Sequence, residues 1–304
     1  MDATVTAVGL GTLLGALARL SMLRVDYRQY PSYPQAYVIH LTLGAIAAFL
    51  GAVAIPALLA KDFAAGTFLS LAATQFREVR NIERETLTRI ESTELVVRGT
   101  AYIEGIARVF EARNYIAMVT ATLSTGGFLL ADAALNTLPA AVLASACVGA
   151  VCIFGLSRAM RGLKVADMAT VRPAEIEFDG PTLVVAGNRL MNVGSEAARE
   201  KYRTEALAVV IEPKDPNAKA TLANTGQRQA LAHNAAALLG VKKDVDTPEF
   251  TPIVRRNIET GEVNLVLIPA ERDMDALLRA VLDTPVLEGA YRRPLAARAA
   301  RMVD

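Results

Sequence analysis

The stretch Leu138–Lys164, LPAAVLASACVGAVCIFGLSRAMRGLK, decides the fold class. Residues 138–156 carry no charge, and as a helix rising 1.5 Å per residue they are long enough to cross about 30 Å of hydrocarbon. Three basic residues, Arg158, Arg161 and Lys164, follow directly. Because basic residues accumulate on the cytoplasmic side of membrane spans, this pattern predicts a span whose C-terminal end faces the cytoplasm.

Further apolar segments lie on the N-terminal side of this stretch. Tyr115–Ala131 predicts the preceding span, and the loop 132–137 that joins the two has no basic residue, which places it outside. Thr4–Leu23 and Tyr37–Ala60 predict two more spans, and Gly11 and Gly15 form a G-x-x-x-G pair that lets another helix approach closely. The charged segment 77–113 then lies in the cytoplasm.

The segment Phe63–Phe76 leaves two alternatives open. It is apolar, but as a helix it is only about 21 Å long. It either crosses the membrane with help from its polar neighbours or forms a re-entrant or interfacial segment. Crossing is favoured because Arg24 and Arg28 then face the cytoplasm. The chain therefore has four or five spans.

The composition agrees with a division into two domains. The chain has 304 residues, 53% of them hydrophobic, and a mean hydropathy of +0.31. The long apolar runs lie in the first half, whereas charged residues recur throughout the second. We predict a transmembrane helical domain over 1–161, with a cytoplasmic helical connector over 77–113, and a cytosolic mixed α/β domain over 162–304. Neither half is a basic domain, so nucleic-acid binding is disfavoured.

The second half alternates strand-like and helical patterns. Strands are predicted at 174–178, 182–186 and 206–211, and a hairpin over 255–268 turns at Thr260-Gly261. Helices are predicted at 196–204, 227–239 and 272–282. Asn224 and Gln227 form a capping-box arrangement before the second of these, and Gly240 is a C-cap signal after it.

The residues that usually carry catalysis or bind metals are scarce. The sequence contains no phosphate-binding loop, no H-E-x-x-H, no nucleophile elbow and no dinucleotide fingerprint. The two histidines, His40 and His233, lie in different halves, and both cysteines, Cys147 and Cys152, fall inside an apolar run. We therefore predict no catalytic residue, no metal site and no cofactor, and we regard an enzymatic activity as not indicated.

The most unusual stretch is GTAYIEGIARVFEAR, residues 99–113, which runs directly into a predicted span. On a helix Glu104, Arg108 and Glu111 share one face, and apolar residues lie largely opposite. Glu104 is either an ionisable group at the membrane edge that holds an ion, a partner or a substrate, or part of a solvated ion-pair face on an interfacial helix. The spacing alone favours the second interpretation.

This stretch also carries a family resemblance. Tyr102, Ile103, Glu104, Gly105, Ile106 and Ala107 spell the signature of the YIEGIA family of bacterial membrane proteins, and Arg108 follows it. The sequence resembles this family further at EIEFDGPTLVV (175–185), TLANTGQRQALAH (221–233) and TPVLE (284–288). The resemblance implies a protein of endospore-forming bacteria with a sporulation or spore-envelope role, no established enzymatic activity and a small capping-type companion protein.

A candidate ligand or partner site lies at a predicted helix start. Its residues are Asn224, Gly226, Gln227, Arg228, Gln229 and His233. Free backbone N–H groups at the helix start, together with Arg228, could bind an anion or a nucleotide phosphate. The alternative is a capped helix that packs on the sheet, with His233 satisfied in the core or at the surface.

Two functional hypotheses follow. The first is a non-enzymatic assembly factor in the bacterial cytoplasmic (inner) membrane, a multi-pass homo-oligomer whose cytoplasmic C-terminal domain recruits a partner. The second is a channel or transporter component with a cytosolic ligand-sensing domain, in which Arg19, His40, Glu104 and Asp132 are pathway residues. The basic tail 291–302 either contacts anionic membrane lipid or forms a solvated helix.

Overall fold

The computed structural model describes residues 2–26, 34–91, 94, 96–159, 162–244, 247–248 and 250–296. The chain forms two compact units, one of residues 1–84 and 106–161 and the other of residues 85–105 and 162–304. The segment 85–105, which the sequence analysis assigned to a connector of the membrane domain, is thus part of the second unit. It contains the first four residues of the YIEGIA signature.

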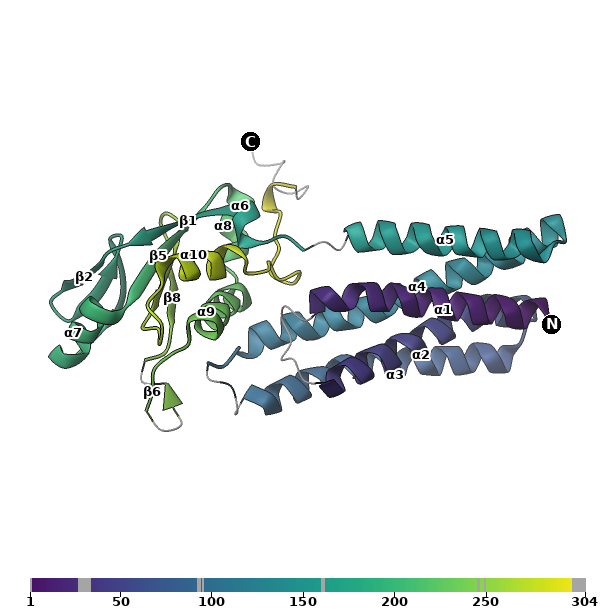
Figure 1. The fold of residues 1–304 in the computed structure, drawn as a ribbon, viewed down its shortest axis with the longest axis horizontal. Helices are drawn as coiled ribbons and strands as arrows, with labels where there is room; N and C mark the ends of the chain where they lie inside the picture. The colour runs from purple at the N-terminus through teal and green to yellow at the C-terminus, as the bar shows by residue number, and fades with distance from the viewer. Residues whose placement is uncertain are drawn as a thin grey trace. The chain divides into compact units, whose positions relative to one another are not determined.

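The first unit is a bundle of long helices (Figure 1). Four helices are long and apolar enough to cross a membrane, among the residues the structure describes. They are α1 (Ala3–Asp26), α2 (Pro34–Leu59), α4 (Thr100–Leu135) and α5 (Leu138–Ala159). Large apolar side chains such as Leu130, Val151 and Phe154 are exposed along them, as expected of surfaces that face lipid. The predicted fold class, an α-helical multi-span domain followed by a mixed α/β domain, is confirmed.

The G-x-x-x-G pair of α1 allows a close helix contact, as predicted. A Cβ atom at Gly15 would lie 2.6 Å from the carbonyl oxygen of Ala117, and one at Gly11 would lie 3.0 Å from that of Ala121. Both partners are on α4, and Thr125 of the same helix donates to the Ala7 carbonyl at 3.4 Å. Larger residues at these two positions of α1 would push α4 away.

Helix α3 (Phe63–Ile90) joins two segments that the sequence analysis treated separately. It runs without a break from the apolar residues 63–76 into the charged residues 77–90, and it is not among the four candidate spans. The helical connector predicted over 77–113 is interrupted, because residues 96–99 are not helical. Gly99, with a φ of +85°, adopts a backbone conformation that glycine tolerates best.

The second unit is built on a four-stranded antiparallel sheet in the order β1-β5-β9-β8. The strands are β1 (Ala169–Ala174), β5 (Leu207–Pro213), β9 (Val263–Leu267) and β8 (Ile253–Arg256). The two central strands are largely apolar, because both of their faces are buried; the exceptions are Asn264 in β9 and Glu212 near the end of β5. Strand β8 is an edge strand, and β1 is the other edge.

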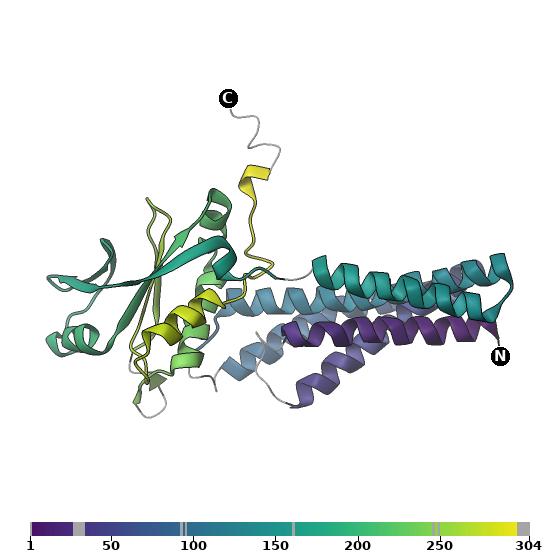
Figure 2. The same cartoon turned by 45° about the horizontal axis from the view of Figure 1, so that its top comes forward.

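Each face of this sheet is covered by a different layer (Figures 1 and 2). Helices α6 (Val165–Met168), α8 (Pro216–Leu222), α9 (Thr225–Leu239) and α10 (Met274–Leu282) pack on one face. A second sheet in the order β2-β3-β4 and helix α7 (Glu196–Glu205) pack on the other. The strands of the second sheet are β2 (Ile176–Asp179), β3 (Thr182–Val185) and β4 (Asn188–Asn192).

Several predicted elements differ from the structure. The strand predicted over 174–178 is divided between β1 and β2, which belong to different sheets. The predicted hairpin is present, although β8 ends at Arg256 and a loop reaches β9. Strand β4, helix α8 and the short hairpin of β6 (Lys243–Asp244) with β7 (Thr247–Pro248) were not predicted. The tail forms a short 3-10 helix (Pro294–Ala296), and Arg298 and Arg301 lie outside the described residues.

The ends of α9 follow the predicted caps. The Asn224 side chain accepts a hydrogen bond from the Gln227 backbone N–H at 3.2 Å, and Gly240 ends the helix with a φ of +67°. In a full capping box the Gln227 side chain would bond back to the start of the helix. Here it bonds instead to the backbone of Pro285 and Leu287.

Candidate functional site

Two of the stretches singled out in the sequence meet inside the second unit. The backbone N–H of Tyr102 donates to Gln229 Oε1 at 3.2 Å, and the Tyr102 ring lies edge-on to His233 with centroids 6.1 Å apart. Gly99 faces the Gln229 amide so closely that a Cβ atom there would clash with it. The start of α4 is therefore held directly against α9.

His233 makes a further bond to the segment before α4. Its Nδ1 lies 2.8 Å from the carbonyl oxygen of Val96. Burial, and then the nearby Arg98 guanidinium, lower the pKa of His233 below its ordinary value. The ring is therefore neutral at pH 7, and we assign the Nδ1–H tautomer, which donates to Val96.

Gln227 brings in the third stretch. Its side chain is fully buried. Its Nε2 donates to the Pro285 carbonyl at 3.1 Å, and its Oε1 accepts from the Leu287 N–H at 2.8 Å. Leu287 in turn packs on Gly105, where a Cβ atom would lie 3.4 Å from Leu287 Cδ1. The Gln227 amide thus bonds to two backbone groups of the loop 285–287.

Arg98 completes this arrangement. It is buried, and it pairs with Glu94 at 2.9 Å and with Glu91 at 3.3 Å. The other oxygen of Glu91 accepts the Gly99 N–H at 3.1 Å. Glu94 and Arg98 are four residues apart, and no sequence signal indicated that Arg98 is buried. We call Arg98, Tyr102, Gln227, Gln229 and His233 the motif interlock.

The remaining predicted site residues lie around the interlock. Gly226 is buried against the backbone of Ala101, where a Cβ atom would lie 2.8 Å from the carbonyl oxygen. Asn224 is engaged as the cap of α9. The free backbone donors expected at this helix start are therefore in part already used, and Arg228 is the predicted ligand residue that is not part of the packing described so far.

Glu104 and Arg108 lie on α4, the first half-buried and the second exposed. Among the other signature residues, Ile103, Ile106 and Ala107 are buried. The role of Glu104 stays a prediction.

A second buried polar group lies in the first unit and joins four helices. Its members are Arg19 of α1, His40 of α2, Glu83 of α3 and Asn114 of α4, each at most 6% exposed. We call them the bundle cluster. Arg19 Nε donates to Asn114 Oδ1 at 3.3 Å, and His40 Nε2 lies 3.9 Å from Glu83 Oε1.

The aromatic ring of Phe110 contacts both basic side chains of the bundle cluster, Arg19 and His40. The Arg19 guanidinium lies 5.2 Å from the centroid of Phe110, and the His40 ring lies 4.5 Å from it. Such distances are typical of cation–π and ring contacts. Of the proposed pathway residues, the structure brings together Arg19 and His40. Asp132 is about 27 Å from Asn114 along α4, at 1.5 Å per residue.

Comparison with known proteins agrees with the signature and its surroundings. The chain matches the family described as YIEGIA protein over residues 7–297. It belongs to the YIEGIA family. It is also 42% identical, over 284 residues, to a protein of Bacillus subtilis (strain 168) described as uncharacterized protein YphB, and the match covers 93% of each chain. No solved structure matches the chain.

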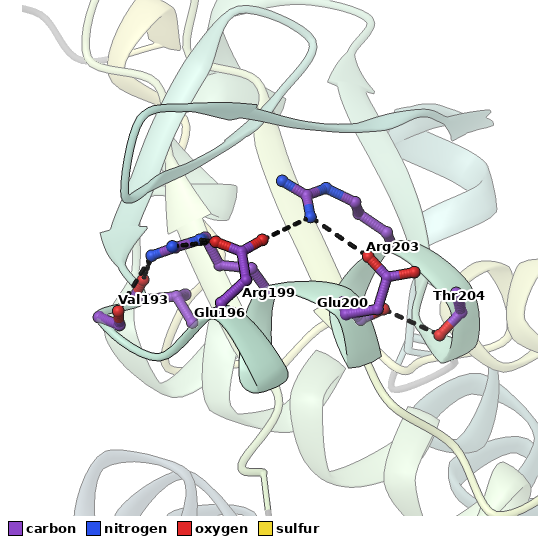
Figure 3. Close-up of polar contacts among 7 residues, drawn as sticks. Val193, Glu196, Arg199, Glu200, Arg203 and Thr204 are labelled. Atoms are coloured by element: carbon purple, nitrogen blue, oxygen red, sulfur yellow. Dashed lines mark hydrogen bonds and ion pairs between the residues drawn. The ribbon is translucent and has the colours of Figure 1, made fainter.

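Other polar groups of this YIEGIA protein form ordinary surface networks. Figure 3 shows α7, where Glu196 pairs with Arg199 and Arg203, and Arg203 also lies 3.3 Å from Glu200. Arg199 closes the preceding loop by donating to the carbonyls of Val193 and Gly194. Because Glu196 and Glu200 are exposed, this network is a solvated helix face.

The described part of this YIEGIA chain has no set of side chains suited to binding a metal ion. No group of three or more His, Cys, Asp or Glu side chains is close enough to hold a metal ion there. Cys147 and Cys152 are both free and lie on α5. The side chains of Gln227, Gln229 and His233 in the interlock bond to backbone atoms, and such contacts hold a fold in place.

Proposed function

We propose that this chain is a non-enzymatic integral membrane protein that acts in assembly. Its helices anchor and oligomerise in the bacterial cytoplasmic membrane, and its α/β unit recruits a protein partner in the cytoplasm during sporulation. The observation that carries the proposal is the motif interlock. Gln227, Gln229 and His233 are engaged with the backbone of distant segments, so the signature region is built to hold a shape rather than to transform a substrate.

Two further observations support the location and the process. The basic residues Arg158, in the last turn of α5, and Arg161 and Lys164, which follow it, favour a cytoplasmic α/β unit. The similar protein of Bacillus subtilis comes from a bacterium that forms endospores. A small capping-type companion is the partner that the family resemblance implies.

The experiment uses a Bacillus subtilis strain that lacks its 42% identical relative and expresses this chain with a C-terminal tag. Membranes from sporulating cells are solubilised, and the proteins that co-purify are identified by mass spectrometry. A small soluble companion recovered in constant proportion supports assembly. A phosphatase fused after Asp304 that is active outside the cell would contradict the proposed topology.

Glu104→Gln is the single substitution that tests the signature. We expect the neutral isostere to abolish spore formation and companion recovery at unchanged membrane levels, because a docking carboxylate loses its charge. Glu111→Gln is the matched control. It removes the same charge two turns further along α4, from a carboxylate that lies 3.8 Å from Arg80. Normal spores from the Glu104→Gln strain would leave only the interfacial ion-pair interpretation.

A second candidate function is supported by the bundle cluster. Ionisable side chains enclosed among membrane helices are costly and often mark pathways for ions or protons. Glu83 Oε1 and Asn114 Nδ2 are enclosed and have no hydrogen-bond partner among the described residues. Ion or proton flux into vesicles reconstituted with the chain, abolished by Glu83→Gln, would favour a channel or transporter component over assembly.

A further inference from the structure

Three arginines gather where α9 meets the edge strand β8. Arg228 lies in the first turns of α9, and Arg255 and Arg256 end β8. Helix α9 packs beside β8 (Figure 1). Side chains alternate along a strand, and Val254 belongs to the core on the α9 side, so Arg256 points to the same side as Val254. By the same alternation Arg255 points to the other face of the strand, where it is exposed at the open edge of the sheet.

Two of these arginines each have a buried N–H donor without an acceptor among the described residues. The Nε–H groups of Arg228 and Arg256 are shielded from solvent and have no hydrogen-bond partner in the part of the chain that the structure describes. Among the described residues the Arg228 guanidinium makes one hydrogen bond, and it is a long one, 3.4 Å from Nη2 to Thr225 Oγ1. A buried donor without an acceptor is costly, so such groups usually indicate a missing partner.

The charges around Arg228 have one sign. Burial lowers the pKa of Arg228 below its ordinary value, and Arg255 and then Arg256 lower it further. No carboxylate of the described residues pairs with any of the three guanidinium groups. By contrast Arg172, on the opposite edge strand β1, pairs with Glu212. Three like charges kept together without a counter-charge destabilise the protein unless an anion joins them.

We propose that Arg228 and Arg256 form a binding site for a phosphorylated ligand, a phosphate ester or a diphosphate group, and that the neighbouring Arg255 adds to its positive potential. The planar guanidinium group offers paired donors that match phosphate oxygens, and two arginines from a helix and one strand edge can grip such a group from two directions. The site lies outside the motif interlock, because Gln227 and Gln229 are turned to other segments of the chain. It does not depend on the assembly function proposed above.

The same chemistry could come from a soluble metabolite or from a lipid headgroup, so the test has two arms. In the first, inorganic pyrophosphate is titrated by calorimetry into the full chain in phosphatidylcholine nanodiscs. In the second, hydrogen exchange of α9 and β8 is followed by mass spectrometry in nanodiscs with and without phosphatidic acid. Arg228→Gln and Arg256→Gln are compared with Arg172→Gln, which removes one positive charge from a paired arginine.

We expect pyrophosphate binding that each site variant weakens about tenfold or more, as for the loss of one charge-assisted contact. Arg172→Gln should bind as the wild-type chain does. Protection by phosphatidic acid alone, lost in Arg228→Gln, would support the site with a lipid headgroup as its source. Absence of both effects, or equal weakening by Arg172→Gln, would overturn the proposal.

A further variant guards against misfolding. Arg255 is exposed, and Arg255→Gln removes repulsion without opening the core, so in the absence of anions it should slow hydrogen exchange in β8. It should also weaken pyrophosphate binding. If Arg255 instead stabilised the fold, its loss would make hydrogen exchange in β8 faster. Faster exchange in β8 of the anion-free Arg255→Gln protein would therefore contradict the proposal.

Discussion

The motif interlock of the second unit and the bundle cluster of the first satisfy buried polar groups in different ways. In the interlock, Gln227, Gln229 and His233 bond to backbone groups over 2.8–3.2 Å. In the bundle cluster, side chains meet side chains over 3.3 Å and 3.9 Å, and enclosed atoms of Glu83 and Asn114 lack a hydrogen bond among the described residues. Backbone partners cannot rotate away, so the interlock specifies one arrangement of its segments.

The comparison separates stability from function. Buried side chains that bond to backbone groups fix one arrangement of a fold, even though Arg98 Nε and the Tyr102 hydroxyl of the interlock have no partner among the described residues. A group of ionisable side chains with unsatisfied atoms costs free energy and tends to persist where it serves a function. The interlock includes residues of the YIEGIA signature and of the stretch 221–233. Substitutions there should nevertheless act mainly by unfolding the second unit. The bundle cluster is the place where substitutions should change activity with a small loss of stability.

The largest expected effect follows from Gln227→Leu. The substitution leaves the Pro285 carbonyl and the Leu287 N–H buried without partners, and each such group costs on the order of 1–3 kcal/mol. We expect a loss of about 4 kcal/mol in the free energy of unfolding, measured by denaturation of the full chain in detergent. Leu238→Gln, at an exposed position of the same helix, is the control and should change little. Equal stability of the two variants would refute the structural role of the interlock.

Arg98→Met should have the next largest effect. It removes the partner of two carboxylates that are themselves partly exposed, so they can regain some hydration. We expect a loss of about 2 kcal/mol, below the usual 3–5 kcal/mol for breaking a fully buried pair. Arg89→Gln, at the exposed pair with Glu85, should stay within about 0.5 kcal/mol. A tolerated Arg98→Met would show that burial of this charge adds nothing.

The two regions should also respond to pH in opposite directions. Burial raises the pKa of Glu83 to about 7, although Arg19 opposes this shift. The folded state therefore holds a proton that the unfolded state releases above its ordinary value of 4.5, and the stability of the first unit falls as pH rises through about 7. Glu83→Gln should remove this fall.

His233 reverses the sign in the second unit. Burial and Arg98 lower its pKa, so the folded ring stays neutral while the unfolded ring gains a proton below 6.5. The second unit should therefore lose stability as pH falls below 6.5, and His233→Gln should flatten this loss. Hydrogen exchange, corrected for its intrinsic pH dependence, reports each unit separately. Parallel pH profiles in the two units would contradict both assignments.

Much of the fold followed from the sequence, since apolar length and charge asymmetry act locally. Examples are the four helices that are long and apolar enough to span a membrane, the caps of α9 and the core strands β5 and β9. What failed depends on distant partners. Residues 96–99 are not helical, and there Val96 bonds to His233 and Gly99 packs against Gln229; β1 is a strand because it pairs with β5.

The candidate site was predicted as a list of residues and not as an arrangement. The signature and the stretch 221–233 were both noted, yet nothing in their spacing indicated that Tyr102 meets Gln229 and His233. Glu83 and Asn114 were missed because a single polar residue on a helix gives no signal of what it faces. Arg255 and Arg256 were predicted as part of a hairpin, and only the packing of α9 on β8 brings Arg256 to the side of the sheet on which Arg228 lies.

The smallest expected effect, Tyr102→Phe, sharpens the comparison because it tests an unused polar atom inside the interlock. The Tyr102 hydroxyl is enclosed and has no hydrogen-bond partner in the described part of the chain. Removing it should change the free energy of unfolding by no more than about 0.5 kcal/mol, since an unsatisfied buried group gives nothing in return for its lost hydration. Tyr102→Leu should cost about 2 kcal/mol more, because the edge-on contact with His233 is lost and a cavity remains. Chemical denaturation of the three proteins in one detergent measures both differences. A loss of more than about 1 kcal/mol in Tyr102→Phe would mean that the hydroxyl has an acceptor in the folded protein, and the tyrosine of the signature would then contribute a bond as well as a ring.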